Sequence, residues 1–139
     1  VTTDVCQDCV VTAGKVIVQR CPKEKVAIVW YDECMLSYAN QSFFSTMDES
    51  PMVFMWNMQN ITEQDQFDQV LGDTMDDLAT RASNDQSANG QYVKRFATEE
   101  ANFTSFQSLY GLVQCTPDLS GADCNRCIRV AIGLLPSCC

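Results

Sequence analysis

The 139-residue chain combines nine cysteines with no histidine and carries a net charge of −9. Without histidine it cannot form a Ser-His-Asp or Cys-His nucleophile, or a zinc site that uses histidine. Its excess of acidic over basic residues also makes it a poor candidate for binding nucleic acid or an anionic membrane. No segment is long and apolar enough to predict a transmembrane helix, and because the chain starts at Val1 we expect any leader to be absent or already removed.

The first third of the chain predicts one helix followed by two strands. Apolar residues and cysteines recur at helical spacing between Cys6 and Ile17. A β-branched and aromatic run over residues 26–31 predicts a strand, and residues 34–38 predict a second one. After Asn40 the pattern is lost, and we interpret residues 45–60 as a linker.

The remainder predicts helix, strand, strand and helix. An apolar stripe over residues 67–82 predicts the first helix, and Asn89-Gly90 predicts a turn. Residues 92–97 and 106–114 are predicted strands with a polar connection, and residues 124–135 predict the second helix. Capping boxes are expected at Thr62/Asp65 and Ser120/Asp123, and Pro136 is expected to end the last helix.

An internal repeat sets the domain organisation. The pattern from Cys6 to Cys21 matches that from Cys124 to Cys139, with every matched position shifted by 118 residues. Since this period cannot fit twice, we expect residues 1–44 to be the C-terminal part of one module and residues 61–139 the truncated N-terminal part of the next. The predicted fold class is α+β: in each module two helices pack on one face of an antiparallel sheet, stabilised by disulfides.

The density of cysteines favours disulfides in an oxidising compartment. The two C-x2-C pairs lie more than a hundred residues apart, which disfavours zinc and redox sites. Sequons at Asn40, Asn60 and Asn102 point to the secretory pathway. Because nine is odd, at least one thiol is unpaired in any monomer.

The spacing Cys115-x8-Cys124-x2-Cys127 resembles the ginkbilobin-homologous, or salt-stress/antifungal, cysteine-rich domain of plants. Residues 109–115, 27–38 and 134–139 also resemble that family, in the tandem form found in ectodomains of cysteine-rich receptor-like kinases. The resemblance implies an extracellular module, either secreted or part of a plasma-membrane ectodomain.

The resemblance also implies a disulfide pairing. Cys115 would bond to Cys124, and Cys9 would bond to Cys34. Partners outside the chain are implied for four further cysteines, namely Cys6, Cys21, Cys127 and Cys139, with Cys138 as the alternative to the last. A permuted module, in which Cys34 pairs with Cys127 instead, stays open at this point.

The function implied is ligand sensing or interaction in a plant cysteine-rich receptor-like protein kinase that acts in stress or defence signalling. We expect no catalysis, cofactor or metal in this segment, because adjacent acids such as Asp76/Asp77 and Glu99/Glu100 point in different directions. The kinase domain and any membrane anchor of such a receptor would lie outside this chain. The partner would be an apoplastic ligand or another ectodomain.

Two other interpretations remain. The chain could be a secreted antifungal, mannose-binding lectin-like protein or a cysteine-rich repeat secretory protein. The family's sugar-binding positions, however, fall on Ile28 and Ala39 in the first copy, and neither side chain can supply a charged hydrogen bond. Alternatively, residues 26–80, which hold ten acids and no Lys or Arg, could meet a basic partner.

Overall fold

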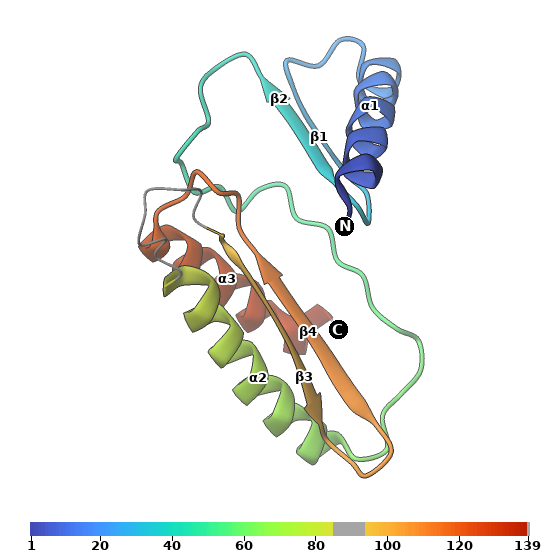
Figure 1. The fold of residues 1–139 in the computed structure, drawn as a ribbon, viewed down its shortest axis with the longest axis vertical. Helices are drawn as coiled ribbons and strands as arrows, with labels where there is room; N and C mark the ends of the chain where they lie inside the picture. Colours follow the sequence, from blue (N-terminus) through green and yellow to red (C-terminus); the bar gives the residue numbers. More distant parts are fainter. Residues whose placement is uncertain (85–93, 139) are drawn as a thin grey trace. The chain divides into compact units, whose positions relative to one another are not determined.

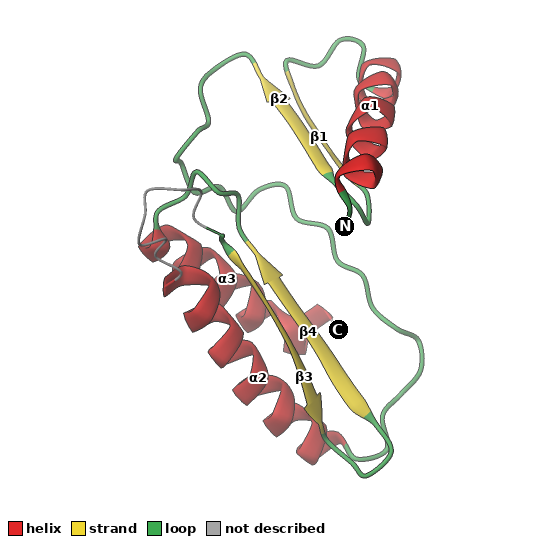
Figure 2. Cartoon of the chain, in the orientation of Figure 1, coloured by secondary structure: helices red, strands yellow, loops and turns green. Residues whose placement is uncertain are grey.

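A computed structural model describes residues 1–84 and 94–138, and the chain divides into two units, residues 1–43 and residues 44–139. The first unit combines one helix, and the second unit two helices, with a two-stranded antiparallel sheet (Figures 1 and 2). The α+β class predicted from the sequence is therefore confirmed.

The first unit holds helix α1 (Thr3–Arg20) and the hairpin of β1 (Val26–Trp30) and β2 (Met35–Ala39). The strands pair antiparallel from Val26↔Ala39 to Trp30↔Met35. The N–H of Tyr31 donates to the carbonyl of Cys34 and closes the turn between them (2.8 Å). All three predicted elements are present. The core of this unit is small: its buried residues are Ala13, Ile17 and Ala27.

The second unit holds α2 (Gln64–Asn84), β3 (Phe96–Asn102), β4 (Ser108–Gln114) and α3 (Gly121–Cys138). The two strands pair antiparallel from Phe96↔Gln114 to Asn102↔Ser108, and both helices lie against one face of this hairpin (Figure 1). Its core draws on every element and comprises Leu78, Ala79, Ala82, Ala97, Val113, Cys115, Leu119, Cys124 and Ile128.

Two glycines allow α2 to approach its neighbours closely. A Cβ on Gly111 would lie 2.6 Å from Cδ1 of Leu78, which is fully buried. A Cβ on Gly121 would lie 2.5 Å from the backbone oxygen of Ser83. Since carbon atoms do not approach this closely, a side chain at either position would force α2 away from β4 or from the start of α3.

The last helix confirms one predicted signal and corrects another. Ser120 caps the helix as expected, because the N–H of Asp123 donates to Ser120 Oγ (3.1 Å). The Asp123 carboxylate accepts the Ser120 hydroxyl (2.7 Å) in place of the Ser120 N–H that a reciprocal capping box would use. The prediction that Pro136 ends the helix is wrong, because α3 continues to Cys138. A proline near the end of a helix removes one backbone hydrogen bond, and α3 keeps its helical geometry past Pro136.

Two other boundaries also differ from prediction. Helix α2 begins at Gln64, and the N–H of Phe67 donates to the carbonyl of Glu63, so the expected cap at Thr62 is wrong. Strand β3 begins at Phe96 and includes Asn102, which we had placed in a polar connection. The sequence of this strand is rich in polar residues, because the residues on its outward face are exposed to solvent. For that reason the sequence pattern does not predict that the strand continues beyond residue 97. The predicted turn at Asn89-Gly90 lies outside the described residues.

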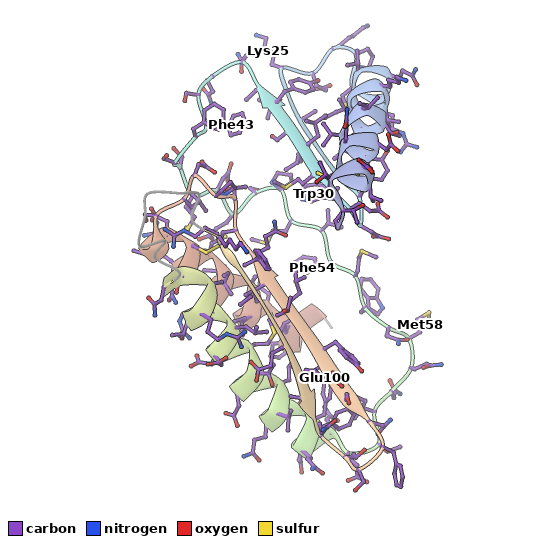
Figure 3. The ribbon with its side chains drawn as sticks, in the orientation of Figure 1. Lys25, Trp30, Phe43, Phe54, Met58 and Glu100 are labelled. Atoms are coloured by element: carbon purple, nitrogen blue, oxygen red, sulfur yellow. A yellow bond between two sulfur atoms is a disulfide. The ribbon has the colours of Figure 1, made fainter. Side chains whose placement is uncertain are left out.

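Residues 40–63, all of which are described, form no helix or strand. Ser45, with a φ of 56°, donates its N–H to the Asp118 carboxylate, and Met47 packs against the core of the second unit. The coil over residues 52–58 is exposed, and Phe54 and Met58 extend from it (Figure 3). Within the described ranges, no helix combines the length and apolar character that crossing a bilayer requires.

Candidate functional site

Within the described part of the chain, each unit contains one disulfide. Cys9 on α1 is bonded to Cys34, which directly precedes β2, with a Cα–Cα distance of 6.0 Å. Cys115, just after β4, is bonded to Cys124 on α3, with a Cα–Cα distance of 5.8 Å, and both are buried. These are the pairs that the family resemblance implies. Cys34 is bonded to Cys9, so the structure does not contain the permuted pair with Cys127.

Three described cysteines are free. Cys6 is exposed, whereas Cys21 and Cys127 are half-buried. Burial raises the pKa of the Cys127 thiol, and the nearby Glu49 carboxylate adds to that effect. Because the thiolate is the reactive form of cysteine, this environment opposes nucleophilic chemistry at Cys127. Cys139 lies outside the described residues.

The adjacent acids serve as structural ion-pair partners. Arg81 donates to Asp77 (3.0 Å) and to Glu99 (2.9 Å), and its second amino group donates to the carbonyl of Thr98 (2.9 Å). The hydrogen bond from Arg81 lowers the pKa of the Asp77 carboxyl. Asp77 and Glu99 therefore share one arginine that connects α2 to β3. The lowered pKa of Asp77 favours its ionised form, which does not suit it to proton transfer.

The other member of each acidic pair faces elsewhere. Asp76 pairs with Arg129 of α3, and Glu100 lies on the opposite face of the hairpin from Glu99, consistent with strand alternation. Among the described residues, no three Cys, Asp or Glu side chains gather in a way that could hold a metal ion.

The two positions that correspond to the family's sugar-binding residues do come together. Ile28 on β1 and Ala39 on β2 lie on the same face of the first hairpin, as the strand register requires. Both are apolar and half-buried. The face therefore lacks polar groups at the two positions that would bind a sugar hydroxyl.

All three sequon asparagines are exposed. Asn40 directly follows β2, and Asn60 lies in the coil before α2. Asn102 is the last residue of β3, opposite Ser108. Each side chain is therefore accessible to a glycan.

An open apolar surface lies on the side of the second hairpin that faces away from α2 and α3. Here Phe96, Tyr110 and Leu112 are 46%, 74% and 63% exposed, and they share the face with Glu100, which is labelled in Figure 3. We call this surface the outer hairpin face. The sequence alone does not predict this face, because β4 has apolar residues on both faces: Tyr110 and Leu112 outward, Leu109 and Val113 inward. Large apolar side chains gathered on one exposed face are typical of interaction sites.

Comparison with known proteins assigns the family. Residues 1–41 and 55–139 match the "Salt stress response/antifungal" family. The chain is 48% identical over its whole length to cysteine-rich receptor-like protein kinase 25 of Arabidopsis thaliana, of which it covers 20%. It is 42% identical, over 96% of its length, to an antimicrobial ginkbilobin-2-like protein of Castanea crenata, of which it covers 53%.

The fold also has a solved counterpart. The tandem DUF26 ectodomain of the Arabidopsis thaliana cysteine-rich receptor-like protein PDLP8 superposes with a TM-score of 0.78, covering 99% of this chain and 59% of that one at 21% identity. The chain thus spans about half the length of some relatives and a fifth of others. It matches the extracellular, non-catalytic module, and a module of this kind interacts with extracellular ligands or partners. The chain belongs to the salt stress response/antifungal family of cysteine-rich extracellular modules.

Proposed function

We propose that this chain is the ligand-sensing part of a cysteine-rich receptor-like kinase ectodomain and that it binds its partner through the outer hairpin face. The carrying observation is the exposure of Phe96 and Leu112 on a hairpin whose other face is fixed by two helices and a buried disulfide. A rigid apolar surface loses little conformational entropy on binding. The kinase and membrane anchor of the receptor would lie in parts of the protein beyond this chain.

The partner we propose is an apoplastic ligand or another ectodomain of the same family, and not a nucleic acid. The test uses the secreted full chain, immobilised for biolayer interferometry, against purified tandem ectodomains such as that of PDLP8 and the ectodomain of receptor-like protein kinase 25. We expect the double variant Phe96→Ser/Leu112→Ser to weaken binding at least tenfold. Val18→Ser is the matched control, because Val18 is 64% exposed on α1, in the first unit. Equal weakening by both variants would refute the role of the outer hairpin face.

The alternative function is a secreted, antifungal, mannose-binding lectin-like or cysteine-rich repeat secretory protein. The 42% identity to a ginkbilobin-2-like protein favours it, whereas the apolar residues Ile28 and Ala39 count against a sugar site in the first unit. Binding of the chain to mannan, competed by free mannose, would replace the receptor proposal with this one.

The remaining cysteines belong to the same proposal. We propose that Cys6, Cys21, Cys127 and Cys139 find their disulfide partners outside residues 1–139, and that residues 45–60 link two successive modules. In the isolated chain, iodoacetamide at pH 8 should then label Cys6 fastest and Cys127 slowest, because Cys127 is half-buried and its pKa is raised. Glu49→Gln should accelerate labelling of Cys127 alone. A Cys127 that resists labelling even in denaturant would be already bonded, which contradicts the proposal.

A further inference from the structure

The sequon that starts at Asn102 stands out because of its surroundings. Asn102 ends β3 with its side chain on the outer hairpin face, since Ala101 and Phe103 on either side of it are half-buried and buried. Ser108 Oγ donates to Asn102 Oδ1 (2.7 Å). Among the described residues, no group pairs with Asn102 Nδ2, which is the atom that carries the sugar in an N-linked glycan.

An aromatic residue, Tyr110, lies on the same face of the hairpin as Asn102. Tyr110 pairs with Glu100 across the hairpin, which makes it the diagonal neighbour of Asn102. Diagonal neighbours on one face of a sheet lie about 7–8 Å apart, within reach of a long side chain. Tyr110 is 74% exposed, and no hydrogen bond or ring contact of its side chain is found among the described residues. Leu112 pairs with Thr98, two pairs further along the hairpin from the Glu100–Tyr110 pair.

We propose that Asn102 carries an N-linked glycan whose first N-acetylglucosamine packs on the ring of Tyr110. The apolar face of a pyranose ring and the exposed tyrosine ring each lose contact with water in this arrangement, which stabilises the hairpin. This inference rests on the extracellular location of the chain and does not depend on the proposed partner.

The modification is a transfer in the secretory pathway from a lipid-pyrophosphate-linked oligosaccharide. Asn102 Nδ2 forms a bond to C1 of the first sugar, while the bond between C1 and the pyrophosphate oxygen breaks. The lipid pyrophosphate leaves with the bonding electron pair, and the displaced amide proton passes to the medium. Thr104 supplies the sequon hydroxyl during transfer, and in the folded chain its Oγ1 accepts the N–H of Phe106 (3.3 Å).

A glycan at this position would divide the outer hairpin face. It would cover the end that holds Asn102 and Tyr110 and leave Phe96 and Leu112, at the opposite end, free for a protein partner. Removing the glycan should therefore leave partner binding within twofold. The two proposals can fail separately. The glycan proposal is tested by sugar occupancy and melting temperature, whereas the proposed function is tested by partner binding.

The first measurement is occupancy. The full chain is secreted from plant cells, its glycans are removed by an amidase that converts each occupied Asn to Asp, and peptides are weighed. We expect conversion at position 102. An unmodified Asn102 in a secreted chain that is modified at Asn60 would overturn the proposal.

The second measurement tests the Tyr110 contact. In the Asn40→Gln/Asn60→Gln background, an endoglycosidase trims the remaining glycan to one N-acetylglucosamine, and melting is compared with a sugar-free chain made in the bacterial periplasm. We expect the single sugar to raise the melting temperature by about 2–4 °C. Tyr110→Ala should abolish this increase, whereas Leu112→Ala, too distant for a single sugar to reach, should preserve it. If the melting temperature still rises in Tyr110→Ala, the proposed packing of the sugar on Tyr110 is wrong. It is also wrong if the melting temperature does not rise in the parent chain. Asn102→Gln supplies a second sugar-free form from the same host.

Discussion

The first unit depends on its disulfide much more than the second unit does on its own. We predict that Cys9→Ala/Cys34→Ala unfolds residues 1–43 in the full chain while residues 44–139 stay folded. Conversely, Cys115→Ala/Cys124→Ala should weaken the second unit without unfolding it. The pair of double variants is matched, because each removes one disulfide and adds no free thiol.

The magnitude follows from loop length and core size. Cys9 and Cys34 are 25 residues apart and Cys115 and Cys124 only nine. Loop-closure entropy makes these disulfides worth about 3.5 and about 2.7 kcal/mol respectively. In the first unit Ile17 is the one large buried side chain, with Ala13 and Ala27 beside it, and burying an isoleucine contributes about 1.5–3 kcal/mol. A 43-residue unit with so small a core has little stability beyond that contributed by its disulfide.

Hydrogen exchange followed by mass spectrometry separates the two units in one experiment. In the parent chain, peptides from α1 and from the hairpin of β1 and β2 should be protected. In Cys9→Ala/Cys34→Ala they should exchange within seconds at pH 7, while peptides from α2 and β4 keep their protection. Retained protection across residues 3–39 in that variant would refute the reasoning, because the core would then be sufficient without the disulfide.

Two further predictions concern the second unit. Gly111→Ala should lower the free energy of unfolding in urea by about 1–3 kcal/mol, because the new methyl group overlaps buried Leu78. Gly133→Ala should raise it by up to about 1 kcal/mol, because nothing lies within 4 Å of a Cβ at that position. Equal effects of the two variants would contradict the close packing at Gly111. The hydrogen bond from the Ser45 N–H is the main cause of the lowered pKa of the Asp118 carboxyl. The stabilisation by this hydrogen bond is therefore fully present above the usual carboxyl pKa, and it is lost as the pH falls through the lowered pKa of Asp118. Amide exchange at Ser45, corrected for its intrinsic pH dependence, should therefore lose protection in acid, and Asp118→Asn should remove the protection at pH 7; protection unchanged in that variant would argue against the contact.

The sequence predicted the element types well because each had a strong local signal. Ser120 caps α3 as expected. Of the apolar stripe predicted for α3, Cys124 and Ile128 lie in the core, whereas Ala131 is exposed and Ile132 packs against the core instead. The β3 boundary failed for a tertiary reason: Glu99 is acceptable inside the hairpin because Arg81 of a different element neutralises it. No local pattern reports such a partner.

The site was harder to predict than the fold. The outer hairpin face depends on register, since Phe96 and Leu112 are separated by 16 positions and share a face only because β3 and β4 pair as they do. Spacing alone identified the cysteines, but only the resemblance to a family paired them. Which face of a sheet stays open is decided by where helices pack, and an amphipathic strand without that context is ambiguous.

Both sheets have only two strands, so each described strand leaves one edge with unpaired backbone N–H and carbonyl groups. Such edges are templates for pairing with another chain, and natural proteins usually protect them with lysines or prolines. In β4, which has neither residue, protection falls to colloidal repulsion: a net charge of −9 keeps copies apart over distances set by ionic strength. For the isolated 139-residue chain we therefore expect solubility to depend on the buffer. It should be greatest in dilute salt near neutral pH, and least where salt screens the carboxylates or acid protonates them.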